Sequence, residues 1–440
     1  MTIPVHRRGL VGGRSPMSSR IPPRLMLYCH DTYGLGHFRR TLTLATFLAA
    51  QTPSLSQLIV TGSPVPHNFR LPERVDYIKL PSVVKVGAAQ YAPRAIKAPF
   101  EDVLNLRRDI ITAAARNFRP HALLVDHAPA GLKGEIVPTL RSLRESSSRT
   151  KLVLGLRDIL DEASEVRAAW GQDGTYELLE DIYDLILVYG QRDVFDPTSE
   201  YELSSAVAAK TRFVGYLVRP PNTRTAEEVR RSLCLRTGRL ALVMAGGGGD
   251  GHDLLRAMLD ALRLEPKPVA FDSLLISGPL MPEAVRDDLQ LMANGSRQVQ
   301  FLSFTDDVPS YLGAADVVVS MGGYNSVCEI LSAGRPAIIV PRVTPRREQL
   351  IRAAAMSRRG LLRMIHPAEL SPQRLLQEIN DLLSGGGNGA ITPLAMDGLP
   401  RAAVELGTLL GLPGPPEHRP AGNRRAEPVD SFMPPAATLD

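Results

Sequence analysis

The fold is decided by residues 315–341, which read ADVVVSMGGYNSVCEILSAGRPAIIVP. The runs at 317–319 and 337–340 are short, apolar and mostly β-branched, as expected for strands buried on both faces of a parallel sheet. Between them lie a Gly-Gly turn, a segment with a helical pattern and a second turn at 334–336. This order of strand, turn, helix and strand predicts a doubly wound α/β domain.

The glycine turn is also a candidate ligand site. Gly322 and Gly323 allow a sharp turn and leave backbone amides uncovered at a helix start, where free N–H groups and the helix dipole favour an anion. Glu329 follows in the same helix, after Asn325 and Ser326, and a carboxylate there can accept hydrogen bonds from the vicinal hydroxyls of a ribose. Together these features indicate a nucleotide site. A merely tight turn and a solvated Glu329 remain as alternatives.

On these residues the segment resembles the C-terminal domain of the family 28 glycosyltransferases, which include the peptidoglycan N-acetylglucosaminyltransferase. The resemblance is closer to a bacterial branch known only as predicted glycosyltransferases. It implies the α/β GT-B architecture, with two Rossmann-like doubly wound domains facing a central cleft. It also implies that Gly322 and Gly323 lie against the donor diphosphate and that Glu329 binds the donor ribose.

Composition sets bounds on the class of protein. With 440 residues, of which 44% are hydrophobic and 22% charged, the chain is an ordinary globular one long enough for two domains. A net charge of +5 fits anionic substrates or an anionic membrane surface. Aromatic residues make up only 5% and do not interleave with a basic stretch, which argues against a nucleic-acid partner.

The three cysteines, Cys29, Cys234 and Cys328, are far apart and form no Cys-x-x-Cys pair. The spacing indicates neither a zinc site nor a disulfide framework, and it predicts buried reduced thiols in a cytosolic protein.

The chain divides into four predicted segments. Residues 1–22 carry several arginines but no apolar core, so they fail as a secretory signal and are predicted to be a disordered basic arm that permits contact with acidic lipid headgroups. Alternating strand and helix patterns predict an N-terminal acceptor-binding domain at 23–218 and a C-terminal donor-binding domain at 219–410, divided at a Pro-Pro pair. Residues 411–440, rich in Pro, Gly and Ala, are predicted to be a disordered tail.

No stretch of the sequence is apolar for long enough to predict a transmembrane helix. We therefore expect a cytoplasmic protein, with peripheral contact at the inner membrane face left open.

The loop after the first predicted strand contains Gly34, Gly36 and His37. It is not a dinucleotide fingerprint, because Arg39 replaces the third glycine and no acid follows at the required distance. The resemblance instead implies a loop in the cleft beside the acceptor. A histidine, which ordinarily titrates near neutral pH, suits the removal of a proton from a sugar hydroxyl, so His37 is the candidate catalytic base. Helix capping or simple acceptor binding are the alternatives. Acceptor-binding candidates are Gly34, Gly36, Arg39 and Asp126.

Further loops follow predicted strands of the second half. The four glycines at 246–249 mimic a P-loop, but His252 and Asp253 stand where Lys and Ser or Thr are needed. Such a loop can still close on a phosphate or a sugar. The resemblance implies nucleobase contact near Thr305 and donor-sugar contacts from Glu348 and Gln349. Donor-binding candidates are Gly246, Gly247, Gly248, Thr305, Gly322, Gly323, Asn325, Ser326, Glu329, Glu348 and Gln349.

The adjacent acids Asp306 and Asp307 invite a metal-binding interpretation. The pair also fits a helix N-cap, and we assign no metal and no cofactor.

The sequence and its resemblance predict a glycosyltransferase that moves a sugar from a nucleoside diphosphate sugar, with UDP as the expected nucleotide, to a sugar- or lipid-linked hydroxyl acceptor. Inversion without a metal is implied by the family. Two alternatives stay open. A nucleotide-sugar 2-epimerase would need several acids in the cleft and no acceptor, and a non-catalytic nucleotide-sugar or lipid-binding module would show no turnover.

Overall fold

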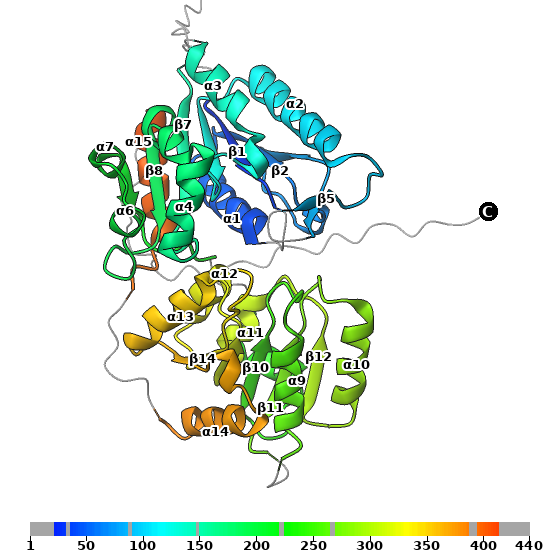
Figure 1. The fold of residues 1–440 in the computed structure, drawn as a ribbon. Coiled ribbons are helices and arrows are strands. Elements are labelled where there is room, and N and C mark those ends of the chain that lie inside the picture. The colour runs from blue at the N-terminus through cyan, green and yellow to red at the C-terminus, as the bar shows by residue number, and fades with distance from the viewer. Residues whose placement is uncertain are drawn as a thin grey trace, which may run out of the picture.

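The computed structural model describes residues 22–31, 36–86, 90–146, 149–219, 224–264, 269–386 and 394–412. In this part of the chain two domains lie one above the other, each built on a parallel sheet (Figure 1). The first sheet has seven strands in the order β3-β2-β1-β6-β7-β8-β9, and the second has six in the order β12-β11-β10-β13-β14-β15. The predicted fold class, two Rossmann-like doubly wound domains, is confirmed.

The first domain follows the predicted alternation. Its strands are β1 (Arg24–Cys29), β2 (Ser56–Thr61), β3 (Val75–Lys79), β6 (Ala122–Asp126), β7 (Lys151–Arg157), β8 (Leu185–Tyr189) and β9 (Thr211–Phe213). Its main helices are α1 (Gly36–Gln51), α2 (Phe100–Phe118), α3 (Val137–Glu145) and α4 (Ala163–Asp173), with the short α5 (Thr175–Glu177), α6 (Pro197–Glu200) and α7 (Ser205–Ala209). The antiparallel pair β4 (Val83–Lys85) and β5 (Tyr91–Pro93) lies outside the main sheet.

Both faces of the first sheet are buried because successive side chains of a strand point to opposite faces. Leu25 and Leu27 of β1 pack in one apolar cluster with residues of α1, whereas Met26 and Tyr28 pack in another with residues of α2, α3 and α4. Continuous apolar strands of this kind are typical of a sheet covered by helices on both sides.

The second domain repeats the pattern. Its strands are β10 (Leu240–Met244), β11 (Asp272–Ile276), β12 (Val299–Leu302), β13 (Val317–Ser320), β14 (Ala337–Ile339) and β15 (Arg363–Met364). Its helices are α8 (Ala226–Ser232), α9 (His252–Ala261), α10 (Glu283–Asn294), α11 (Val308–Ala314), α12 (Tyr324–Ser332), α13 (Glu348–Arg358) and α14 (Pro372–Leu383). The segment that decided the fold thus folds as β13, α12 and β14.

The last helix, α15 (Gly398–Leu410), returns to the first domain and lies behind β8 in Figure 1. Leu399 and Leu406 are buried in the cluster that contains α1, and the amide of Tyr216 donates to the carbonyl of Ala395 at 2.8 Å. The predicted second domain extended to residue 410 and did not include this return. Residues 1–21 of the predicted arm, 220–223 of the predicted linker and 413–440 of the predicted tail lie outside the described residues.

The two domains share a buried contact region. Arg352 of α13 and Asp158, which follows β7, form an ion pair of 2.8 Å in which both side chains are fully buried. The hydroxyl of Tyr324, at the start of α12, donates to the carbonyl of Tyr189 at 3.0 Å. One apolar cluster also contains residues of both sheets, so the domains are packed together as well as linked by the chain.

Two further expectations can be compared with the structure. Cys29 and Cys328 are buried as predicted, but Cys234 is exposed, so the prediction of buried thiols is wrong at that position because it follows the short surface helix α8. In the described part of the chain, no helix is both long enough and apolar enough to span a bilayer.

Candidate active site

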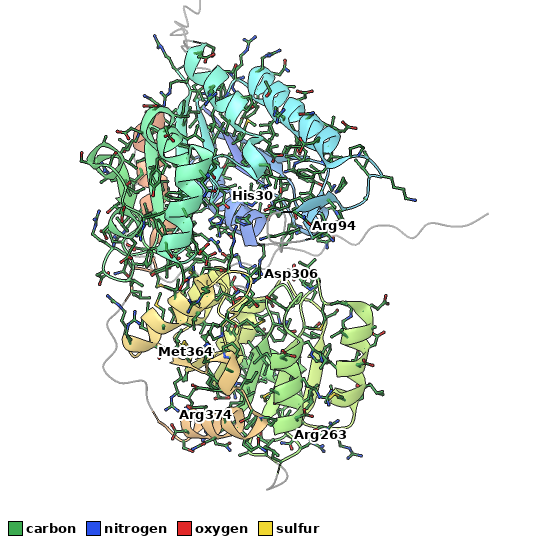
Figure 2. All side chains as sticks on the ribbon, in the orientation of Figure 1. His30, Arg94, Arg263, Asp306, Met364 and Arg374 are labelled. Carbon is green, nitrogen blue, oxygen red and sulfur yellow. The ribbon has the colours of Figure 1, made fainter. Side chains whose placement is uncertain are left out.

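The site lies in a cleft of about 780 Å³ lined by residues of both domains. Each sheet has a point where the strand order reverses, at β1 between β2 and β6 and at β10 between β11 and β13. Ligands of open α/β sheets bind beyond the carboxyl ends of the strands at such points. The loops after the strands of both sheets line this one cleft, and Figure 2 shows His30 and Asp306 at the facing edges of the two domains.

Twelve of the predicted site residues line the cleft. They are Gly36, His37 and Arg39 from the first domain, and Gly246, Gly247, Thr305, Gly323, Asn325, Ser326, Glu329, Glu348 and Gln349 from the second. Gly248, Gly322 and Asp126 do not line it, and Gly34 lies outside the described residues.

His37, the predicted base, belongs to a buried charge cluster. It is the second residue of α1, and its Nδ1 lies 2.7 Å from Oδ2 of Asp126, the last residue of β6. Arg40 donates to both oxygens of Asp126, from Nε at 2.9 Å and from Nη2 at 2.6 Å. The side chains of Arg40 and Asp126 are 3% and 2% exposed, whereas that of His37 is 14% exposed and reaches the cleft.

Asp126 therefore holds His37 in place and is not among the residues that line the cleft. Burial alone would raise the pKa of Asp126, but Arg40 and His37 together hold the pKa of this carboxyl well below its usual range. Nδ1 of His37 lies 2.7 Å from Oδ2 of Asp126 and 3.1 Å from Nη2 of Arg40, so these two side chains together orient the imidazole ring. Asp126 is enclosed and both of its oxygens are occupied, so its acceptor role stays a prediction that this position does not favour.

Two more imidazoles surround His37. The ring of His30 lies 4.7 Å from that of His37, and the ring of His127 lies 4.9 Å from it. Burial, and then neighbouring positive charges, lower the pKa of His127, and burial lowers that of His30. His127 also has a φ of 70°, which a non-glycine residue seldom adopts and which is found most often at functional sites.

The predicted acceptor and donor residues meet across the cleft. The carbonyl of Gly36 accepts from Nδ2 of Asn325 at 3.1 Å. Arg39 lies with Nη2 at 3.4 Å from Oε1 of Glu329, and Arg219 donates to the same oxygen at 2.9 Å. Glu329 is only 8% exposed. This carboxylate, which was predicted to bind a ribose, is held by two arginines, one from α1 and one that follows β9.

The start of α12 has the predicted anion-binding form. No side chain caps this helix, whose N-cap is Gly323, so the first amides remain open to a ligand. Gly322 has a φ of +82°, and a Cβ there would lie 2.6 Å from Cγ2 of Ile339. Gly322 is therefore needed to form the turn, and Gly323 is the glycine that faces the cleft.

The glycine-rich loop after β10 has a mixed role. Gly246 and Gly247 line the cleft, but Gly248 packs against the loop after β11, where a Cβ would lie 2.3 Å from the carbonyl oxygen of Ser277. The position after β10 is at the strand-order reversal, which explains why this loop reaches the ligand space.

The predicted sugar-binding pair is held by Arg342. Nη2 of Arg342 donates to Oε1 of Glu348 at 2.7 Å, and its backbone amide donates to Oε1 of Gln349 at 3.0 Å. The other carboxylate oxygen of Glu348 is buried and has no hydrogen-bond partner. Burial would raise the pKa of Glu348, but Arg342 and other arginines lower it, so this oxygen is a charged acceptor in need of a donor.

The acids near Thr305 have structural partners. Oγ1 of Thr305 accepts from the amide of Asp307 at 3.1 Å, and Asp307 lies 3.4 Å from Arg224. Asp307 occupies the N-cap position of α11, although its side chain makes no capping bond there. Thr305 is thus a cleft residue whose side chain also holds the turn that follows it.

Sequence reasoning missed the cleft residues Lys85 and Arg157, and it missed Arg219, which lines a small second pocket beside Arg39 and Glu329. Arg157 ends a strand that was predicted, and the rule that loops after strands carry the site could have found it. Lys85 lies on β4, which was not predicted.

The sequence of the second domain is similar to that of a known protein family. Residues 241–392 match the sequence profile of the Glycosyltransferase family 28 C-terminal domain. This similarity covers the second domain from β10 to the residues that follow α14.

Curated relatives are similar to this chain over part of its length. The UDP-N-acetylglucosamine--N-acetylmuramyl-(pentapeptide) pyrophosphoryl-undecaprenol N-acetylglucosamine transferase of Halalkalibacterium halodurans is 26% identical over 183 residues, which cover 41% of this chain and 48% of that protein. The chain thus spans about half the length of the curated relative it matches.

Solved structures cover both domains and establish the fold. The calicheamicin glycosyltransferase CalG4 is 16% identical with a TM-score of 0.58, covering 89% of this chain and 99% of its own. A protein assigned as a UDP-N-acetylglucosamine 2-epimerase of Listeria monocytogenes is 12% identical with a TM-score of 0.60. The match covers 90% of this chain and 99% of that protein. The two described domains together therefore have the GT-B fold.

Proposed function

We propose that this chain is a glycosyltransferase that moves a sugar from a nucleoside diphosphate sugar, with UDP as the nucleotide, to a hydroxyl acceptor with inversion. The observation that carries the proposal is the position of His37, held by Asp126, in the same cleft as the uncapped start of α12. A base and an anion site that face one cleft from different domains suit transfer between two bound substrates.

The first domain supplies the base. With its Nδ1 proton bonded to Asp126, His37 presents Nε2 to the cleft, where it takes the proton of the acceptor hydroxyl as that oxygen attacks the anomeric carbon of the donor sugar. Arg40 keeps Asp126 ionised and in place. The proton ends on His37, and the electron pair of the broken glycosidic bond leaves with the diphosphate.

The second domain stabilises the leaving group. Negative charge grows on the diphosphate as the bond breaks, and the free amides and dipole at the start of α12 meet it in a partly enclosed site, where such interactions are strong. Glu329 is the ribose-binding acid of this proposal, since nucleotide hydroxyls can replace the contacts it makes with Arg39 and Arg219. The unpartnered oxygen of Glu348 suits a hydroxyl of the donor sugar.

The acceptor is proposed to be sugar- or lipid-linked, and the protein to be cytoplasmic with peripheral contact to an anionic membrane face. Support for a lipid-linked acceptor comes from the Halalkalibacterium halodurans relative, whose name gives an undecaprenol-linked acceptor. Support for the membrane contact comes from the arginines of the N-terminal segment and from the net charge of +5.

The proposal is tested first by thermal unfolding of the wild type and of Glu329→Ala with UDP, dTDP, GDP and their sugars. A ligand at roughly 100 times its dissociation constant adds about 2.7 kcal/mol to stability. We expect a raised unfolding temperature with UDP or a UDP-sugar that is lost in Glu329→Ala. Glu227→Ala is the matched control, because Glu227 is 83% exposed on α8, and it should keep the shift. No shift with any nucleotide in the wild type would refute the donor site.

Turnover separates the alternatives. Isomerisation of a UDP-sugar without an acceptor would assign a 2-epimerase, and nucleotide binding with no turnover against any acceptor would assign a binding module. Release of UDP that depends on an acceptor and falls in His37→Gln supports the transferase.

A further inference from the structure

The side chain of Tyr324 crosses from the second domain into the first. Tyr324 is the first residue of α12, which lies at the edge of the second domain that faces the first, and it is only 3% exposed (Figure 1). Its hydroxyl donates to the carbonyl of Tyr189 at 3.0 Å and accepts from the amide of Leu217 at 3.4 Å, and both partners lie in the first domain. The phenol is therefore anchored in a different domain from the one that carries its backbone.

The ring of Tyr324 lies against two buried guanidinium groups. The guanidinium carbons of Arg40 and Arg352 each lie 5.5 Å from the centre of the ring. A guanidinium within about 6 Å of an aromatic ring is attracted by the negative face of the ring, and most strongly where water is excluded. Both arginines are buried, so the ring of Tyr324 helps to fix both guanidinium groups.

Arg40 links this ring to the proposed base. Nη2 of Arg40 lies 2.6 Å from Oδ2 of Asp126 and 3.1 Å from Nδ1 of His37. The ring of Tyr189 also lies near the guanidinium of Arg40, at 6.0 Å. The carboxylate of Asp126 fixes the direction in which Arg40 points, and the rings fix the plane of its guanidinium. A change in the ring at position 324 therefore reaches His37 through a single side chain.

The backbone of Tyr324 faces the site assigned to the other reactant. Its amide belongs to the uncapped first turn of α12, and Tyr324 lines the cleft. The side chain of the next residue, Asn325, donates to the carbonyl of Gly36 at the start of α1, at 3.1 Å. Tyr324 and Asn325 thus hold the start of α12 against the residues that carry and orient His37.

We propose that Tyr324 is a positioning residue of the transfer reaction, which fixes the base His37 relative to the donor diphosphate through the contact of its ring with Arg40. The proposal rests on the proposed function, which assigns the base and the diphosphate site. The side chain acts through Arg40 and not on the reacting atoms. Alignment of bound reactants supplies a large part of the rate enhancement in such reactions, so a small displacement of the base lowers turnover strongly.

A second interpretation of these contacts is that Tyr324 only fills the contact between the domains. Tyr216 provides the matched control, because its ring is 1% exposed, lies in the same apolar cluster and is 6.2 Å from the ring of Tyr324. Among the described residues, Arg40 lies over the rings of Tyr189 and Tyr324 but not over that of Tyr216. Loss of the ring at 216 therefore disturbs the packing and leaves the contact with Arg40.

The first test follows the imidazole of His37 by NMR in the full chain. Its ring signals are identified by their loss in His37→Gln. Tyr324→Phe keeps the ring and should leave these signals in place. Tyr324→Leu removes the ring and should move them, whereas Tyr216→Leu should not.

A series of fluorinated phenylalanines at position 324 isolates the contact with Arg40. Fluorine withdraws electron density from the face of the ring and so weakens its attraction for a cation, while the ring keeps its shape. The His37 signals should move further from their position in Tyr324→Phe with each added fluorine. Because these rings fit the same space, the series keeps the test valid if Tyr324→Leu does not fold.

Turnover is the second test, measured as release of UDP that depends on an acceptor. Tyr324→Leu should lower kcat by ~10-fold or more, which corresponds to about 1.4 kcal/mol in the barrier, and should leave the thermal shift with UDP unchanged. Tyr324→Phe and Tyr216→Leu should retain the kcat of the wild type. A residue that only stabilised the fold would lower the unfolding temperature without separating turnover from nucleotide binding.

Two outcomes would overturn the proposal. One is that the His37 signals stay in place in Tyr324→Leu and in the fluorinated series. The other is that they move equally in Tyr216→Leu, because packing between the domains would then be sufficient. If the wild type shows no acceptor-dependent release of UDP, the proposed function fails, while the NMR comparison still decides whether the ring of Tyr324 positions His37.

Discussion

The substitution Asp126→Asn tests the cluster that holds the base. Asp126 accepts three hydrogen bonds, from His37 at 2.7 Å and from Arg40 at 2.9 and 2.6 Å. An Asn has one acceptor oxygen, so its NH2 group must face a donor of Arg40 whichever way it turns. At least one charge-assisted hydrogen bond is lost, worth about 1.5–3 kcal/mol. Removal of one partner of a buried ion pair costs about 3–5 kcal/mol in all. Because Asn retains one acceptor, we expect a loss of about 3 kcal/mol in the free energy of unfolding.

The assay uses the single tryptophan of the chain. Trp170 is buried in α4 of the first domain, so its fluorescence in urea reports the unfolding of the domain that contains Asp126. Asp260→Asn is the matched control, because Asp260 pairs with Arg256 on the surface of α9, where such pairs contribute little. A loss below about 1 kcal/mol in Asp126→Asn would refute the view that this buried pair holds the cluster together.

The stability difference between the wild type and Asp126→Asn should also depend on pH. The folded state lowers the pKa of Asp126, so its contribution to stability is complete above the ordinary aspartate value of about 3.9 and is lost as the pH falls below it. The difference in unfolding free energy between wild type and Asp126→Asn should be the same at pH 7 and pH 5, and should shrink at pH 3. A difference that grows on acidification would contradict the assigned charge state.

Three other outcomes are expected. His37→Gln should lower the turnover number by ~10²–10⁴-fold and leave the thermal shift with UDP unchanged, and a variant that retains full turnover would exclude His37 as the base. Gly322→Ala should cost about 1–3 kcal/mol in a urea titration because its φ is +82°, whereas Gly323→Ala, with open space at its Cβ, should match the wild type. Arg352→Met should lower the unfolding free energy by about 3–5 kcal/mol because Asp158 stays buried without a cation, and an unchanged midpoint would show that the pair does not stabilise the domain contact.

The sequence predicted the strands well for a physical reason. Strands buried on both faces are short apolar runs between polar turns, and β13 and β14 lie on the two runs at 317–319 and 337–340 that the sequence indicated. The pair β4 and β5 was missed because two three-residue strands carry too little periodicity to be recognised. The position of α15 was missed because an apolar helix pattern does not tell which domain will bury it.

The sequence predicted which residues form the site better than it predicted the contacts between them. Turn glycines and a spaced acid identified the start of α12 and Glu329, since both lie in one continuous segment. The contact between His37 and Asp126 joins residues 89 positions apart, and it follows from sheet order, which a single sequence does not reveal. In the same way, the carboxylates that neutralise Arg342 depend on which loops meet across the cleft.

The return of α15 to the first domain has a consequence for work on isolated halves. Because the chain leaves the first domain after β9 and comes back before α15, the second domain is topologically an insertion within the first. A truncated protein that ends before residue 394 would expose the apolar surface that Leu399, Ala402 and Leu406 cover. A chimaera that exchanges the second domain should therefore replace residues 224–386 between two retained junctions, so that the first domain keeps its own final helix.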